Sequence, residues 1–190
     1  VYKRQELGTP LPVNLIGKWN DWLLKYVNMK NLFLMRHGKS SWELNVSDQD
    51  RALLQRGVND AHLVAMEIAR QDIKIDKVYT SPANRAFHTC MICLRIIGHP
   101  LNNCGIDSSL YDFSGDQVFE FIKQLEDTFE NVLIFGHNHA FTYLANSLGD
   151  KHIDNVPTSG FVQLQFKENS WAAITQGSTI QTIFPKQLKA

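Results

Sequence analysis

Short, mainly apolar runs, each followed by a stretch with helical periodicity, constrain the fold of this chain more than any other feature. They cover residues 32–35 (LFLM), 78–80 (VYT) and 132–135 (VLIF). Runs of this kind are typical of strands buried on both faces of a sheet. Their alternation with helices predicts an α/β fold, a three-layer sandwich in which helices flank a mostly parallel central sheet. Residues 161–166 and 181–184 alternate in polarity instead, which predicts an antiparallel edge near the C-terminus.

The helical segments are marked by the spacing of their apolar residues and by their ends. Apolar side chains recur at helical intervals over residues 57–69, 116–127 and 141–148. A fourth helix is predicted between Ser81, which we expect to act as its N-cap, and Gly98, a typical C-terminal stop. Each helix therefore follows a predicted strand or its connecting loop.

The composition fits a globular domain and argues against several classes of protein. The 190 residues are 44% hydrophobic, with 19 basic and 19 acidic side chains and a formal net charge of zero. Nucleic-acid and membrane-surface binders need a basic excess, so we expect neither kind of partner. No apolar run approaches the roughly 18 residues of a membrane span. Three cysteines, an odd and sparse set, argue against a disulfide-stapled secreted protein, so we expect a cytoplasmic location.

Residues 1–28 differ in character from the rest of the chain. They combine prolines with two tryptophans and show no strand alternation, whereas Met29 leads directly into the first predicted strand. Residues 1–5 (VYKRQ) also match the peptide encoded by the end of a common sequencing-library transposon. We therefore predict an N-terminal extension over 1–28, read-through or otherwise non-native, and a functional domain over residues 29–190. The alternative is a native helix over residues 19–26, where the apolar spacing is also helical.

Charged and titratable side chains follow each of the three apolar strands. Arg36 and His37 come directly after the first strand. Arg85 follows the second strand, and His137 follows the third. Since ligands of such sheets bind beyond the carboxyl ends of the strands, we expect these side chains to meet at one rim.

This set of side chains suits a phosphoryl group. Guanidinium groups bind phosphate oxygens in bidentate fashion and stay charged at any working pH. A neutral imidazole is a nucleophile for phosphorus, and its pKa near 6.5 also makes it an adequate leaving group. Gly38 would let the backbone approach the anion closely. We expect catalysis by positioning and charge stabilisation, with no metal and no cofactor.

Several sequence blocks surround these residues in a fixed order. Residues 34–38 (LMRHG) contain an Arg-His-Gly signature, and residues 39–42 (KSSW) come next. Residues 50–57 (DRALLQRG), 81–89 (SPANRAFHT) and 136–138 (GHN) come later. The series resembles the histidine phosphatase (phosphoglycerate mutase-like) superfamily, and in particular its SixA-type phosphohistidine phosphatases. The resemblance covers the whole predicted domain, which it identifies as a histidine phosphatase domain.

The resemblance implies roles for individual residues. His37 would be the phosphorylated nucleophile, and Arg36 and Arg85 would hold the phosphate. His137 would complete the pocket as the second histidine. The implied reaction is hydrolysis of a phosphorylated substrate, a phosphohistidine protein or a small phosphate compound, through a phosphohistidine enzyme intermediate. Further contacts with the substrate are expected from Gly38, Ser40, Arg51 and Asn138.

Departures from the family pattern bear on the substrate. Glu43 stands where mutases often have a phosphate-contacting asparagine, and an acid there would repel phosphate, which argues against the mutase branch. Ester-cleaving members carry a glutamate acid in a mid-chain insertion that this chain lacks. An imidazole leaving group, with a pKa near 6.5, needs such a proton far less than an alkoxide does. The sequence therefore favours protein phosphohistidine, and Asp112 and Asp116 are the candidate proton donors if one is needed.

Other interpretations of single features stay open. His137 and His139 could bind a metal, as in metal-dependent phosphoesterases, although the other ligand segments of such enzymes are not found in the sequence. We expect His139 instead in the pocket wall or at a helix start. Cys90 and Cys93 could form a zinc or redox site, but their helical spacing favours buried apolar positions. A small-molecule phosphomonoesterase, or a phospho-ligand binding domain without turnover, would use the same rim.

Overall fold

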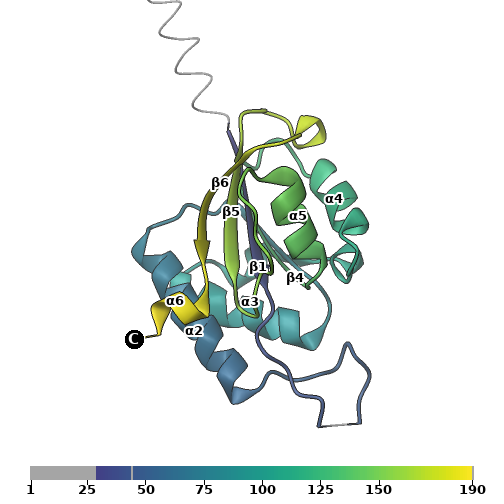
Figure 1. Cartoon of the computed structure of the whole chain (residues 1–190), viewed down its shortest axis with the longest axis vertical. Helices are drawn as coiled ribbons and strands as arrows, with labels where there is room; N and C mark the ends of the chain where they lie inside the picture. The colour runs from purple at the N-terminus through teal and green to yellow at the C-terminus, as the bar shows by residue number, and fades with distance from the viewer. Residues whose placement is uncertain (1–28, 44, 190) are drawn as a thin grey trace, which may run out of the picture.

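A computed structural model describes residues 29–43 and 45–189, which form one six-stranded sheet with helices on both faces (Figure 1). The predicted extension over residues 1–28, and its alternative helix over residues 19–26, lie outside the described residues. In the part that is described, none of the helices has both the length and the apolar character to cross a bilayer. The strands are β1 Lys30–Arg36, β2 Lys77–Thr80, β3 Cys104–Ile106, β4 Asn131–Gly136, β5 Phe161–Phe166 and β6 Ser178–Ile183.

The sheet has the order β3-β2-β4-β1-β5-β6. The strands β3, β2, β4 and β1 are parallel, and β5 and β6 are antiparallel to their neighbours. The predicted mostly parallel sheet with an antiparallel C-terminal edge is therefore confirmed. The sequence did not reveal β3, because three residues of the pattern Cys-Gly-Ile at the edge of a sheet form no recognisable apolar run.

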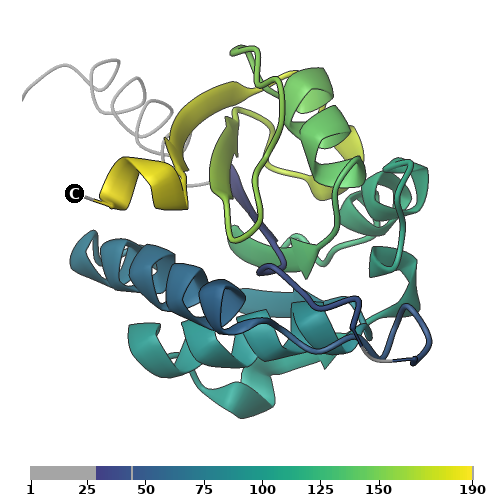
Figure 2. The ribbon, with the colours of Figure 1, turned by 60° about the horizontal axis from the view of Figure 1, so that its bottom comes forward.

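The helices are α2 Gln55–Arg70, α3 Asn84–Ile97, α4 Asp116–Lys123, α5 Ala140–Leu148 and α6 Pro185–Leu188. Figure 2 shows α2, α3 and α6 on one side of the sheet and α4 and α5 on the other. The central strand β1 serves both layers: Leu32 and Leu34 pack with α4 and α5, whereas Phe33 and Met35 pack with α2 and α3. Burial on both faces explains why the sequence of β1 contains a continuous apolar run.

Two helix ends differ from the sequence prediction. The helix α3 begins at Asn84, with Ala83 as N-cap, so the prediction of Ser81 as the cap is wrong. The helix α4 ends at Lys123 instead of continuing to residue 127. Asp127 lies in a turn, where its carboxylate accepts the backbone N–H of Trp171 at 2.8 Å. This tertiary contact replaces the last helical turn that the apolar spacing predicted.

Candidate active site

His37 lies at the carboxyl end of β1, where the chain leaves the sheet. Its backbone N–H donates to the carbonyl of Gly136 at 3.0 Å, and its own carbonyl accepts from the N–H of Ser159 at 3.1 Å. The ring nitrogen Nδ1 lies 2.8 Å from the carbonyl oxygen of Gly38. Because a carbonyl only accepts, this contact places the proton of the neutral ring on Nδ1 and leaves a lone pair on Nε2. Nε2 is therefore the nitrogen available for nucleophilic attack.

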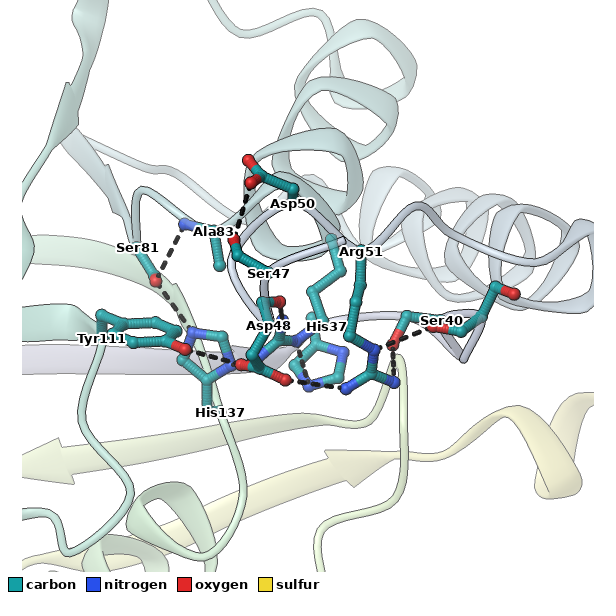
Figure 3. A network of polar contacts seen from close by, with 12 residues as sticks. His37, Ser40, Ser47, Asp48, Asp50, Arg51, Ser81, Ala83, Tyr111 and His137 are labelled. Carbon is teal, nitrogen blue, oxygen red and sulfur yellow. Dashed lines mark hydrogen bonds and ion pairs between the residues drawn. The ribbon is translucent and has the colours of Figure 1, made fainter. Parts of the chain in front are cut away.

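His137 follows β4 and faces His37, with the two ring centroids 5.1 Å apart (Figure 3). Its Nδ1 lies 3.3 Å from Nη2 of Arg85, and its Nε2 lies 2.8 Å from the hydroxyl of Ser81. A guanidinium only donates, so Nδ1 accepts and the ring proton sits on Nε2, where it is donated to Ser81. Ser81 thus fixes the tautomer and orientation of the second histidine, in place of the predicted helix cap.

Arg85 lies in the first turn of α3 and is 2% exposed. Its Nε is 3.4 Å from Nε2 of His37, so the edge of the guanidinium formed by Nε and Nη2 faces both histidine rings. The end formed by Nη1 and Nη2 donates to Asp48: Nη1 to the backbone carbonyl, and Nη2 to the carboxylate at 2.7 Å. The structure therefore brings together side chains from three separate strand ends, as the sequence predicted.

Arg36, the last residue of β1, opens onto the same cleft as His37. Its Nη1 donates to the carbonyl of Val156 at 2.7 Å. Its Nε is buried, and within residues 29–43 and 45–189 it has no hydrogen-bond partner. Burial lowers the pKa of Arg36 to about 10, which still leaves the guanidinium charged at neutral pH. A buried cationic donor without a partner favours an anion at this position.

Both histidines are neutral at physiological pH. Burial lowers the pKa of His37 to about 3; the Gly38 carbonyl opposes this shift and the charge of Arg85 adds to it. Burial also lowers the pKa of His137 to about 3, with further contributions from His37 and Arg85. A neutral imidazole is the form that attacks phosphorus. A bound phosphoryl dianion would raise both pKa values, so His137 can gain a proton when substrate binds.

The site opens to solvent through a cleft of about 310 Å³. Two aromatic side chains on its wall reach into solvent: Trp42 is 74% exposed and Phe113 is 45% exposed. Phe113 also packs on His137, with the ring centroids 5.1 Å apart. The lining residues are Arg36, His37, Lys39, Ser40, Trp42, Asp48, Arg51, Arg85, Phe113, Asn138, His139 and Thr158.

Sequence comparisons identify the family of this chain. A family model described as histidine phosphatase superfamily (branch 1) matches residues 32–110. An uncharacterised protein of Mycobacterium leprae is 30% identical over 149 residues, which cover 68% of this chain and 86% of that protein. An uncharacterised protein of Mycobacterium tuberculosis is 27% identical over 159 residues, which cover 75% of this chain and 93% of the relative. The chain belongs to the histidine phosphatase superfamily.

The fold also resembles that of a solved structure. The protein histidine phosphatase SixA, in complex with tungstate, aligns with a TM-score of 0.72 and 23% sequence identity. The alignment covers 84% of this chain and 99% of that one. At this level of identity the likeness concerns the fold, and it confirms the predicted α/β architecture.

Ser40 and Arg51, predicted to contact substrate, are paired with each other in the structure. Nη2 of Arg51 donates to the hydroxyl of Ser40, and Nε donates to the carbonyl of Ser41, both at 2.8 Å. Nη1 donates to Asp48 at 3.0 Å, and the guanidinium lies on the ring of Trp42 with Cζ 3.1 Å from the centroid. Every nitrogen of Arg51 thus already donates within the protein. The structure favours a supporting role over the predicted substrate contact.

Gly38 and Asn138 are also held by neighbours. The N–H of Gly38 donates to the hydroxyl of Thr89 at 2.9 Å and is not free for an anion. A Cβ at Gly38 would lie 2.8 Å from the carbonyl oxygen of Gly57, so glycine is required here for close packing of two backbones. Asn138 lines the cleft, while its Nδ2 donates to Asn155 at 2.7 Å. In this structure the predicted substrate contacts of Gly38 and Asn138 compete with hydrogen bonds inside the protein.

Neither predicted proton donor suits that role. Burial raises the pKa of Asp112, but hydrogen bonds from Ser114 and Gly115 outweigh this and hold the pKa below its ordinary value. Its carboxylate accepts backbone N–H groups at the start of α4, so it is an ionised helix cap and not an acid. Asp116 lies on a separate cavity of about 480 Å³ beside Tyr79. Both predictions are corrected by these positions.

Asp48 is the site residue that sequence reasoning missed. Its carboxylate accepts from Arg85, from Arg51 and, at 2.6 Å, from the hydroxyl of Tyr111. Nearness in sequence was the only available signal, since Asp48 lies three residues before Arg51, with which it pairs. Nothing in the sequence links Asp48 to Arg85, however, which lies 37 residues further along the chain.

The histidines and cysteines that the sequence left as possible metal ligands lie in other surroundings. In the described ranges there is no cluster of three or more His, Cys, Asp or Glu side chains placed to hold a metal ion. His139 is exposed on the cleft wall and is the N-cap residue of α5, as predicted. Cys90 and Cys93 are buried in α3, which confirms their apolar environment.

Proposed function

We propose that this chain is a phosphatase that acts through a phosphohistidine intermediate on His37, with protein phosphohistidine as its substrate class. The arrangement of Nε2 of His37 and Nδ1 of His137 along one edge of Arg85 carries this proposal. Two ring nitrogens, each with its lone pair directed at Arg85, border a buried cationic donor edge, and the lone pair of His37 accepts only a long hydrogen bond of 3.4 Å. A phosphoryl group placed there meets a nucleophile and bidentate hydrogen bonds at once.

The reaction proceeds in two transfers. Nε2 of His37 attacks phosphorus and forms an N–P bond, while the bond from phosphorus to the leaving nitrogen of the substrate breaks and that nitrogen keeps the electron pair. Arg85 and Arg36 hold the phosphoryl oxygens, and His137, once protonated, hydrogen-bonds them as well. Water then attacks phosphorus, the bond to Nε2 breaks, and inorganic phosphate leaves with the neutral imidazole restored.

The acid–base properties of the cleft favour an imidazole leaving group. Among the described lining residues, Asp48 carries the only carboxyl group. Burial raises its pKa, but hydrogen bonds from Tyr111, Arg51 and Arg85 outweigh this and hold the pKa below its ordinary value. Asp48 is therefore ionised and cannot protonate an alkoxide. An imidazole whose other ring nitrogen carries a proton leaves as the neutral ring, whose conjugate acid has a pKa near 6.5, and needs no such help. The likeness in fold to SixA, described as a protein histidine phosphatase, supports the same class.

His139 favours a second candidate, a small-molecule phosphomonoesterase. Its imidazole lines the cleft and can donate a proton to a leaving oxygen. A phosphomonoester would use the same attack by His37, with His139 rather than a carboxyl group as the acid.

A comparison of three substrates tests the proposal. We expect kcat/KM to be highest for a phosphohistidine protein, lower for an aryl phosphate and lowest for phosphoglycerate. His37→Ala should remove all three activities, and a chelator such as EDTA should change none of them. A preference for phosphoglycerate would support the phosphomonoesterase. Loss of activity in EDTA would favour a metal-dependent phosphoesterase, and no turnover of any substrate would favour a phospho-ligand binding domain.

A further inference from the structure

Asp48 stands in a tight turn that presents its carboxylate to the site. The backbone N–H of Asp50 donates to the carbonyl of Ser47 at 3.1 Å, and the hydroxyl of Ser47 donates to the carboxylate of Asp50 at 2.6 Å. Figure 3 shows the Asp48 carboxylate between Tyr111 and Arg51, each of which donates to it. Partners on both sides leave this carboxylate little freedom to rotate.

The contacts of Arg85 divide between two edges of its guanidinium. The end formed by Nη1 and Nη2 is taken up by Asp48, which accepts through both its backbone carbonyl and its carboxylate. The side edge formed by Nε and Nη2 faces the two histidine rings. A guanidinium is planar and rigid, so fixing its end also fixes the direction of its side edge.

We propose that Asp48 is a positioning residue that holds the end of the Arg85 guanidinium, so that its side edge points at the phosphoryl group between His37 and His137. This role rests on the proposed phosphatase function. Asp48 acts through Arg85 and does not itself touch the substrate. Tyr111 and Arg51 are the outer partners that keep the carboxylate in place, and the 38% exposure of its side chain puts it at the inner margin of the cleft.

A simple charge effect predicts the opposite behaviour. Asp48 is a negative charge beside a site for an anion, so its removal makes the cleft more positive. If charge alone mattered, neutralising Asp48 would lower KM for an anionic substrate and would leave kcat unchanged or raised. If Asp48 positions Arg85, neutralising it lowers kcat, because the hydrogen bonds that stabilise the transferring phosphoryl group lose their alignment.

The kinetic test compares Asp48→Asn with Asp50→Asn, which removes one negative charge from the same turn without a contact to Arg85. With an aryl phosphate as substrate, we expect Asp48→Asn to lower kcat by about 10- to 100-fold, with KM unchanged or lower, and Asp50→Asn to stay near the wild type. Asp48→Glu keeps the charge but moves the carboxylate by one methylene, so it should also lower kcat. Wild-type kcat in Asp48→Asn, or in Asp48→Glu, would overturn the proposal.

Two further measurements isolate the link to Arg85. In an Arg85→Lys background, which has no guanidinium to align, Asp48→Asn should cost less than about threefold in kcat. The ¹⁵N–¹H resonance of Arg85 Nε, assigned by its absence from Arg85→Lys, should be sharp in the wild type and in Asp50→Asn but broadened in Asp48→Asn. An unchanged resonance in Asp48→Asn, or a full additive loss of rate in the double variant, would contradict the proposal. The resonance needs no turnover, so inactivity of the wild type would refute the phosphatase function while this measurement still decides the role of Asp48.

Discussion

The side chains at the base of the cleft are more deeply buried and more fully hydrogen-bonded than those at its rim. At the base, His37, Arg85 and His137 are 9%, 2% and 1% exposed, and each is held by hydrogen bonds to other segments of the chain. At the rim, Trp42 and Phe113 are 74% and 45% exposed and stand on connecting loops. These hydrogen bonds hold the side chains of the base in a single arrangement. We propose that the base carries out phosphoryl transfer and that the exposed rim selects the substrate.

The position of each group in the fold accounts for this difference. His37 and His137 directly follow the central parallel strands β1 and β4, and Arg85 lies in the first turn of the helix after β2. Strand pairing therefore fixes the backbone positions of these three residues. The rim residues belong to loops whose paths the sheet does not dictate. Variants that change kcat without KM, or KM without kcat, therefore test the difference between the base and the rim.

The largest expected effect is at the base, in His37→Ala. Removing the nucleophile should lower kcat by at least about a thousandfold. The Tm should stay close to that of the wild type, because the backbone contacts of residue 37 remain. Steady-state rates on an aryl phosphate and a thermal melt check both statements. A variant that keeps more than a tenth of wild-type kcat would break the assignment of chemistry to the base.

A smaller loss of kcat is expected when Ser81, which holds the ring of His137, is changed. Ser81→Ala removes the acceptor that holds Nε2 of His137, so the ring can rotate or change tautomer. We expect kcat to fall by about 10- to 100-fold with little change in KM. Ser147→Ala, which removes an exposed hydroxyl from α5 away from this cleft, is the matched control and should have near wild-type kcat. Equal rates for the two serine variants would show that the orientation of His137 does not matter.

Burial of the base should also appear in the pH dependence of stability. The pKa of His37 is lowered from 6.5 to about 3 by burial, so between these pH values the unfolded chain binds more protons at this residue than the folded one. Its contribution to stability is present above pH 6.5 and is lost as the pH falls toward 3. Urea unfolding of His37→Gln should show a shallower loss of stability over this range. The wild-type slope in His37→Gln would contradict the burial effect.

The smallest effect is expected at the rim. Trp42→Ala removes an exposed ring that rests on Arg51, so we expect KM for a phosphohistidine protein to rise by about 2- to 10-fold while kcat changes less than twofold. For a small aryl phosphate both constants should stay near wild type. Tyr143→Ala, an exposed aromatic away from this cleft, is the control. A fall in kcat as large as that of Ser81→Ala would remove the distinction between base and rim.

The residues at the base of the cleft could be predicted from the sequence because a general rule gives their location in the fold. Short apolar strands identify a parallel sheet, and the rule that ligands bind at the strand ends selects Arg36, His37, Arg85 and His137. The motif series then supplied the family. The helix limits were less accurate at Ser81 and at residue 127, because tertiary hydrogen bonds outweighed local preference at both positions.

The surroundings of the base could not be predicted in the same way. Ser40 and Arg51 match family motifs, but a motif does not reveal that Arg51 donates to the hydroxyl of Ser40. Asp112 looked like a free acid because its role as the cap of α4 depends on how the chain folds back over residues 114–118. Asp48 was missed because its partners Arg85 and Tyr111 are distant in sequence. Such pairings depend on loop paths, for which no periodic pattern exists.

Trapping the covalent intermediate tests the central claim most directly. The enzyme is mixed with substrate labelled with ³²P in the phosphoryl group, quenched in alkaline denaturant within milliseconds, and digested for peptide mapping. The account predicts label on the peptide that contains Arg36 and His37, with no label in His37→Ala. Label on any other residue, or turnover by the wild type without a labelled enzyme, would contradict it.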